Sequence, residues 1–172
     1  MNLDLRTFIH DVKDYPKPGI LFKDITPLLR NGPAFSECIE VLATAVKAFG
    51  ADQIAAPESR GFLFGAPVAA RLGIGFVPIR KKGKLPRKVR SITYALEYGT
   101  DTLTMHEDAV EPGQRVVLLD DVLATGGTMA ACVALVRESG AEVTGIGFLM
   151  ELAFLHGRSK FDGIPIYSAV TY

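Results

Sequence analysis

The chain has 172 residues, 48% of them hydrophobic, and its 19 Lys and Arg balance its 19 Asp and Glu. Because one domain usually holds about 100 to 200 residues, we expect residues 1–172 to form a single domain with a full core. Zero net charge excludes recognition of nucleic acid or of an anionic membrane surface through bulk charge. The N-terminal residues do not resemble a signal peptide, and no stretch approaches the about 18 apolar residues of a membrane span. We therefore expect a cytoplasmic protein that binds neither nucleic acid nor membrane.

Two isolated cysteines, Cys38 and Cys132, lie in segments with helical patterning. Neither belongs to a CxxC motif or has a neighbouring His, so the sequence supports no redox motif and no zinc site. We expect both to be buried free thiols in a reducing compartment.

The first predicted elements are two helices. One covers residues 5–12, where apolar side chains repeat at helical spacing until Pro16 and Pro18 end the pattern. The second covers residues 33–49, with Pro33 in its first turn and Gly50 just after its end.

Short apolar runs predict strands at residues 53–56, 75–79, 115–119, 143–149 and 164–170. Helical patterns separate several of them, the first reaching Ala70 with a stop at Gly73, the second covering residues 127–138 with a stop near Gly140. Strands that alternate with helices predict right-handed βαβ units. The fold class is therefore α/β, an open, mostly parallel, twisted sheet flanked by helices.

A basic segment at residues 80–91, RKKGKLPRKVRS, fits none of these elements. Seven of its twelve residues are Lys or Arg, and Gly83 and Pro86 interrupt it. Like charges repel one another and disfavour compact structure, so we predict a mobile loop or a loose ribbon. A charge run is also often only a solvated face, and that alternative stays open.

The sharpest chemical signal is VVLLDDVLATGGT at residues 116–128. An apolar strand ends in two carboxylates, Asp120 and Asp121, and a loop of small residues then opens a helix. In an open α/β sheet, ligands bind beyond the carboxyl ends of the strands. Backbone N–H groups, Thr hydroxyls and the helix dipole suit such a loop to a phosphate. The predicted phosphate loop consists of Ala124, Thr125, Gly126, Gly127 and Thr128.

The neighbouring carboxylates restrict which kind of phosphate ligand can bind. Two acids beside a phosphate repel it unless a neutral, hydroxylated group lies between them. A ribose 5-phosphate meets this condition, with the loop on its 5-phosphate and Asp120 and Asp121 accepting hydrogen bonds from its 2- and 3-hydroxyls. A Walker A loop is excluded because its lysine is missing.

The segment VVLLDDVLATGGT resembles the phosphoribosyl pyrophosphate signature of the type I phosphoribosyltransferases. Three further segments resemble the adenine phosphoribosyltransferases: PGILFKDITP at 18–27, ESRGFLFG at 58–65 and YALEYG at 94–99. The resemblance spans essentially the whole chain. It implies a small N-terminal base-binding hood at about residues 1–30 and a flexible lid loop at about 81–95. It also implies a homodimer that makes AMP and pyrophosphate from adenine and phosphoribosyl pyrophosphate, with Mg²⁺, in purine salvage.

The resemblance assigns residues to the adenine end of the site. The backbone of Leu21 and Lys23 is implied to read the adenine edge, and Phe22 to stack on the ring. Arg60 approaches from the other side, and Glu97 is the acid/base residue. Backbone pairing separates adenine from hypoxanthine, because a mismatch leaves buried polar groups unpaired at about 1 to 3 kcal/mol each.

The pyrophosphate end is assigned to the turn at Glu58, Ser59 and Arg60 and to basic side chains of the lid, Lys81, Lys84 and Arg87. In the family, the peptide bond that matches Glu58–Ser59 is cis. Charge develops on the sugar and on the leaving group during the transfer, so electrostatic stabilisation at both ends governs the rate. Mg²⁺ is expected to be held mainly by the substrate's pyrophosphate and ribose, and the sequence assigns it no protein ligands.

Two other functions remain open at this point. One is a phosphoribosyltransferase for hypoxanthine, guanine, xanthine or orotate, against which FKDITP and LEYG speak. The other is a non-catalytic regulator that senses phosphoribosyl pyrophosphate while binding nucleic acid. The zero net charge and the presence of Glu97 disfavour the regulator.

Overall fold

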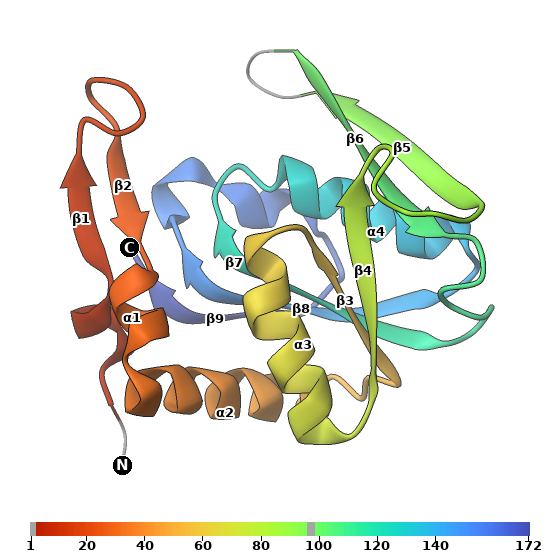
Figure 1. Cartoon of the computed structure of the whole chain (residues 1–172), viewed down its shortest axis with the longest axis horizontal. Helices are drawn as coiled ribbons and strands as arrows, with labels where there is room; N and C mark the ends of the chain where they lie inside the picture. Colours follow the sequence, from red (N-terminus) through yellow and green to blue (C-terminus); the bar gives the residue numbers. More distant parts are fainter. Residues whose placement is uncertain (1–2, 96–98) are drawn as a thin grey trace.

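The computed structural model describes residues 3–95 and 99–172. Its main sheet has seven strands in the order β5-β6-β4-β3-β7-β8-β9 (Figure 1). Five of them are parallel: β4 (Gly75–Lys81), β3 (Gln53–Pro57), β7 (Arg115–Leu123), β8 (Glu142–Glu151) and β9 (Ile166–Thr171). At one edge, β6 (Thr100–His106) runs antiparallel to β4 and to β5 (Val89–Ala95). The predicted α/β class with a mostly parallel sheet is confirmed.

Helices cover both faces of this sheet. Side chains alternate between the two faces of a strand; in β7, Val116 and Leu118 pack with residues of α4 (Gly127–Glu138). Val117 and Leu119, one position along, belong to the second core with α2 (Gly32–Ala48) and α3 (Arg60–Leu72). Both faces of β7 are therefore buried, which explains its uninterrupted apolar run.

The predicted helices α2, α3 and α4 are confirmed; α4 has the predicted ends, and the ends of α2 and α3 differ from the predicted ones by one or two residues. The Asn31 side chain accepts a hydrogen bond from the Ala34 N–H at 3.0 Å and so caps α2. Beyond α3, Gly73 adopts a left-handed φ of 69°, a conformation that favours glycine. Cys38 and Cys132 are buried free thiols inside α2 and α4, as expected.

The predicted N-terminal helix over residues 5–12 is wrong. The chain makes one 3₁₀ turn, η1 (Leu5–Phe8), and then β1 (His10–Lys13), which pairs antiparallel with β2 (Leu21–Asp24). A lone helix of two turns is marginal in water, whereas the extended backbone of β1 gains a hydrogen-bonded partner in β2. This hairpin, followed by α1 (Thr26–Arg30), forms the predicted hood segment and lies to the left in Figure 1.

The predicted loop at residues 81–95 is wrong for its second half. Val89–Ala95 forms β5 and pairs with β6 over seven positions, so the alternative of a ribbon describes it better. The inward side chains Ile92 and Tyr94 pack against the core that contains α4, which compensates for the surrounding charge. The strand β6 was not predicted, although Leu103 and Met105 are buried in alternation with more polar neighbours.

The helices of the described residues are all too short or too polar to cross a membrane.

Candidate active site

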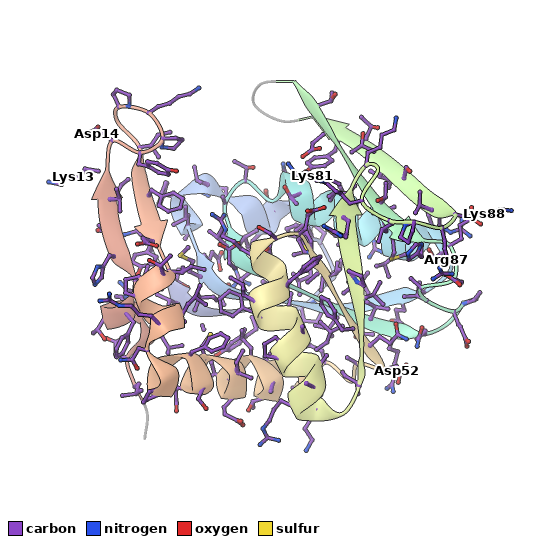
Figure 2. All side chains as sticks on the ribbon, in the orientation of Figure 1. Lys13, Asp14, Asp52, Lys81, Arg87 and Lys88 are labelled. Carbon is purple, nitrogen blue, oxygen red and sulfur yellow. The ribbon has the colours of Figure 1, made fainter. Side chains whose placement is uncertain are left out.

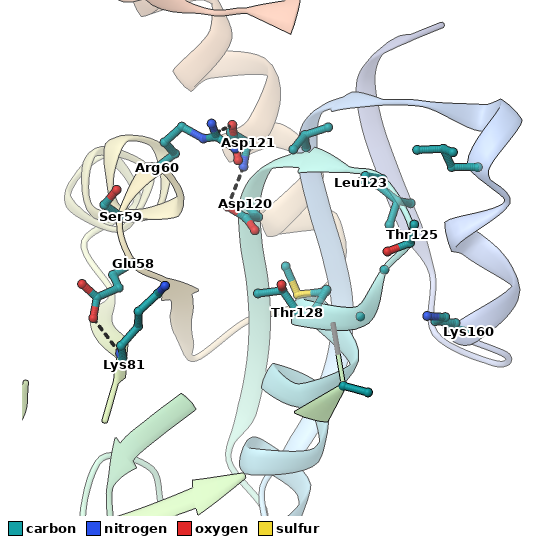
Figure 3. Close-up of a pocket in the computed structure, with 17 residues that line it drawn as sticks. Glu58, Ser59, Arg60, Lys81, Asp120, Asp121, Leu123, Thr125, Thr128 and Lys160 are labelled. Carbon is teal, nitrogen blue, oxygen red and sulfur yellow. Dashed lines mark hydrogen bonds and ion pairs between the residues drawn. The ribbon is translucent and has the colours of Figure 1, made fainter. Parts of the chain in front are cut away.

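A pocket of about 830 Å³ opens beyond the carboxyl ends of β3 and β7, at the start of α3 and of α4 (Figure 3). Ligands of open α/β sheets bind at this edge. The pocket gathers polar residues that are far apart in the sequence. They are Glu58, Ser59, Arg60, Lys81, Asp120, Asp121, Thr125, Thr128 and Lys160.

The predicted phosphate loop, residues 124–128, lines this pocket in full. Its Gly126 has a φ of 79°, and a Cβ there would lie 3.0 Å from the Gly157 carbonyl oxygen. Both the backbone conformation and the lack of space therefore require glycine. The helix α4 begins at Gly127, and the first N–H groups of a helix have no partner within it. The loop therefore presents unpaired donors and a positive dipole end to an anion.

Two carboxylates stand beside this loop. The strand β7 runs on through Asp120 and Asp121 to Leu123, further than predicted, and both acids line the pocket. Burial raises the pKa of both carboxyls, and the charge of Asp121 raises the pKa of Asp120 further. Buried carboxylates of this kind gain from neutral hydrogen-bond donors such as sugar hydroxyls.

The start of α3 is packed tightly against these acids. A Cβ at Gly61 would lie 3.0 Å from Asp120 Oδ1 and 3.1 Å from the Leu119 carbonyl oxygen, so only glycine fits without movement. The next residue back, Arg60, places its Nε 2.7 Å from Asp121 Oδ2. This ion pair opposes the effect of burial, but burial is the larger effect and the pKa of Asp121 stays above its usual value.

The turn between β3 and α3 contains a cis peptide bond at Glu58–Ser59, as the resemblance implied. Glu58 is tied to β4, because its backbone N–H donates to the Ile79 carbonyl at 2.8 Å. Its carboxylate accepts from the Lys81 backbone N–H at 2.6 Å. These contacts fix one wall of the pocket.

Three of the residues assigned to adenine, Leu21, Phe22 and Lys23, lie on β2, outside the lining of this pocket. Phe22 connects them to it, since the Arg60 guanidinium carbon lies 5.9 Å from the Phe22 ring centroid. The Lys23 ammonium is directed elsewhere, 2.5 Å from Asp11 Oδ1 and 3.8 Å from the Tyr172 ring centroid. The side chain of Lys23 is therefore already paired, and the side chain of Leu21 is exposed.

The three lid cations differ in position. Lys81 lines the pocket, with its Nζ 3.2 Å from Asp101 Oδ2. Lys84 is exposed and Arg87 is ion-paired with Asp108, and neither contributes to the pocket lining. Figure 2 shows Arg87 at the right-hand end of the β5–β6 hairpin, away from Lys81. The remaining assigned residue, Glu97, lies outside the described residues.

Leu155 and Lys160 are among the lining residues that sequence reasoning missed. They come from the segment between β8 and β9, which contains the 3₁₀ turns η2 (Ala153–Leu155) and η3 (Gly157–Lys160). No periodicity or motif of the sequence connects this segment to a loop about 35 positions earlier.

Comparison with known proteins identifies the family. A model of the phosphoribosyl transferase domain matches residues 25–160. The curated adenine phosphoribosyltransferase of Desulfitobacterium hafniense is 52% identical over 170 residues, 99% of this chain and 98% of the relative. The crystal structure of the Thermoanaerobacter pseudethanolicus adenine phosphoribosyltransferase superposes with a TM-score of 0.95 at 55% identity, covering 98% of both chains.

A third relative was solved with ligands. The Saccharomyces cerevisiae adenine phosphoribosyltransferase, in complex with adenine and D-2,5-dideoxy-2,5-imino-altritol 1,6-bisphosphate, has a TM-score of 0.90 and is 41% identical, covering 96% of both chains. The phosphate loop, the acid pair and these full-length similarities together show that the chain belongs to the adenine phosphoribosyltransferases of the type I phosphoribosyltransferase family.

Proposed function

We propose that this pocket binds phosphoribosyl pyrophosphate and that the chain transfers its 5-phosphoribosyl group to adenine, forming AMP and pyrophosphate in purine salvage. The observation that carries the proposal is the position of the Asp120–Asp121 pair directly beside the loop at 124–128. A phosphate loop and two hydroxyl acceptors together suit a ribose 5-phosphate. The yeast relative, solved with adenine and a sugar-like bisphosphate, supports the same pair of ligands here.

The reaction exchanges one bond at the anomeric carbon of ribose. A ring nitrogen of adenine forms a bond to C1, the bond from C1 to the pyrophosphate oxygen breaks, and its electron pair leaves with pyrophosphate. The proton lost by adenine goes to a base, a role that the resemblance assigns to Glu97. A positioned carboxylate in such a role contributes roughly 10² to 10⁴ in rate.

Each part of the pocket has a task in this reaction. Residues 124–128 hold the 5-phosphate, and Asp120 and Asp121 accept hydrogen bonds from the ribose hydroxyls. The wall of Glu58, Ser59 and Lys81 lies opposite the phosphate loop (Figure 3), and we assign it to the pyrophosphate. Of the lid cations, Lys81 is the one whose position supports pyrophosphate binding in this structure; Lys84 and Arg87 would reach it only after a movement of the hairpin.

Adenine is proposed to lie between Phe22 and Arg60. In the free protein, the Arg60 guanidinium carbon lies 5.9 Å from the Phe22 ring centroid and forms a cation–π contact with it. Entry of a flat base between the two groups would require only a small displacement of the hood. The backbone groups of Leu21 and Lys23 would then select the 6-amino edge.

Magnesium is proposed to enter with the substrate. Among residues 3–95 and 99–172 no three His, Cys, Asp or Glu side chains are grouped closely enough to hold a metal. Carboxylate oxygens are suitable Mg²⁺ ligands, so Asp120 and Asp121, which line the pocket, would suit a Mg²⁺ that arrives with the substrate. When bound, Mg²⁺ would neutralise charge on the pyrophosphate leaving group.

A homodimer and a cytoplasmic location are further parts of the proposal. The dimer rests on the family resemblance. The location agrees with the two buried free thiols, Cys38 and Cys132, which suit a reducing compartment.

Incubation of the protein with phosphoribosyl pyrophosphate, Mg²⁺ and one of five bases tests the proposal. The bases are adenine, hypoxanthine, guanine, xanthine and orotate, and chromatography identifies the nucleotide. We expect AMP from adenine and less than a tenth of that rate from each other base. Turnover of hypoxanthine at a rate within tenfold of that of adenine would contradict the proposal that β2 reads the adenine edge. If no nucleotide forms from any base, the proposed enzymatic activity is wrong.

A further inference from the structure

The segment between β8 and β9 packs against the back of the phosphate loop. A Cβ at Gly157 would lie 2.3 Å from the Ala124 carbonyl oxygen, so the two backbones are in close contact. On the same side, a Cβ at Gly126 would lie 3.1 Å from the Phe161 ring. Residues 157–161 therefore support the loop directly and bring their own side chains to its edge.

Buried polar contacts hold this segment in place. The Glu151 carboxylate, 5% exposed, accepts from Arg158 Nε at 2.7 Å and from the Ser168 hydroxyl at 2.8 Å. Burial alone would raise the pKa of Glu151, but these donors outweigh it and the pKa is lowered. Because the carboxylate stays charged and paired, the backbone two residues before Lys160 is fixed relative to the sheet.

Lys160 extends from this anchored backbone to the pocket. Its side chain is exposed and lines the pocket, and Figure 3 shows it beside Thr125, across the pocket from Glu58 and Lys81. The loop itself, residues 124–128, contains no charged side chain. Lys160 is therefore a cation at the end of the pocket where the phosphate loop lies.

The other cations of the pocket are already engaged with carboxylates. Arg60 pairs with Asp121 at 2.7 Å, and Lys81 with Asp101 at 3.2 Å. Within the described part of the chain, Lys160 has no carboxylate within 4.0 Å, although Glu138 and Asp162 share a neighbouring groove with it. Its charge is thus available to an anion in the pocket.

We infer that Lys160 contributes binding energy to the 5-phosphate of the substrate and of AMP, in addition to the loop's backbone donors. The inference rests on the proposed function, because it takes the ligand at the loop to be a ribose 5-phosphate. A lysine acts on phosphate as a mobile point charge, so its contribution is electrostatic and depends on salt.

The test compares Lys160→Met and Lys160→Arg with the wild-type protein. Lys47→Met, an exposed lysine in the last turn of α2, serves as the control. Calorimetry gives the Kd of AMP, ribose 5-phosphate and pyrophosphate, and of adenosine, which is AMP without its phosphate. Thermal unfolding of each variant verifies the fold.

We expect Lys160→Met to weaken AMP and ribose 5-phosphate by about tenfold, the size of one modest charge-assisted contact. Adenosine and pyrophosphate should be unaffected, Lys160→Arg should retain most of the affinity, and the loss should shrink at high salt. Unchanged AMP affinity, or an equal loss for adenosine, would overturn the inference. A wild-type protein that binds neither AMP nor ribose 5-phosphate would instead contradict the proposed function.

Discussion

Arg60 and Asp121 form an ion pair, Nε to Oδ2 at 2.7 Å, while the same guanidinium lies 5.9 Å from the Phe22 ring centroid. One side chain thus connects the acids assigned to ribose with the ring assigned to adenine. The connection exists because α3 begins at Arg60, directly after the turn that follows β3. We therefore expect the position of adenine relative to the ribose carbon that it attacks to depend on this contact.

Replacement of Arg60 by Lys tests that connection. Lysine keeps the charge but lacks the planar guanidinium group, which can pair with a carboxylate and stack on an aromatic ring at the same time. We expect kcat/KM for adenine to fall at least about tenfold, the size of a lost charge-assisted contact. The matched control is Arg71→Lys on the same helix, where Arg71 Nε lies 2.6 Å from Glu40 Oε1 on the surface. Equal steady-state kinetics of the two variants would contradict the role of Arg60.

Asp120→Asn should weaken ligand binding and stabilise the fold. The pKa of Asp120 is raised well above its usual value, first by burial and then by Asp121. A folded state with a raised carboxyl pKa loses stability as the pH rises above the unfolded value of about 4. The Asn variant lacks this loss, so its Tm should exceed that of the wild type at pH 7.5, with the difference shrinking toward pH 4. Calorimetry should show weaker AMP binding, and unchanged AMP affinity would contradict the assignment to ribose.

Asp52→Asn is the control for Asp120→Asn, and it should change the stability in the opposite direction. Hydrogen bonds from Arg115 lower the pKa of Asp52 to about 2. A depressed pKa contributes stability that is present above the unfolded value and is lost as the pH falls through the folded one. The Tm of this variant should be below that of the wild type at pH 7.5, and the difference should shrink as the pH falls from about 4 through about 2, with AMP binding unaffected.

Gly157→Ala should displace the phosphate loop, because residue 157 contacts the loop backbone. The added Cβ would lie 2.3 Å from the Ala124 carbonyl oxygen, a backbone atom, so one of the two segments has to move. We expect weaker AMP binding and a lower Tm, because overpacking of a close contact typically costs about 1 to 3 kcal/mol. Gly32→Ala is the control, since a Cβ there meets nothing within 4 Å. Identical AMP titrations of both variants would show that the loop does not depend on Gly157.

Trypsin should cut the free protein first in the basic segment between Lys81 and Arg90. Residues 82–88 connect two strands and carry exposed lysines, whereas Arg90 is paired within β5. Pyrophosphate adds further countercharge to this basic segment, so phosphoribosyl pyrophosphate with Mg²⁺ should slow the cut strongly and AMP less. Equal rates with and without the ligand would mean that the segment is only a solvated surface.

Local signals predicted the elements that form the phosphate loop. The apolar run of β7, the glycines at 126 and 127 and the boundaries of α4 are properties of neighbouring residues, and the predicted helix matches the observed Gly127–Glu138. The hood was misread because its apolar spacing fits a helix, whereas pairing with β2 decides the structure. Lys160 was missed because its place in the pocket depends on the buried Glu151–Arg158 contact and on Gly157, none of which leaves a periodic signal.

The most direct test of the whole account is a crystal structure of the protein with AMP. We predict the phosphate within hydrogen-bond distance of the backbone N–H groups of residues 125–128, the ribose hydroxyls on Asp120 and Asp121, and the adenine between Phe22 and Arg60. A nucleotide bound the other way round, with its phosphate against Glu58 and Lys81 and its base near Thr125, would contradict the account.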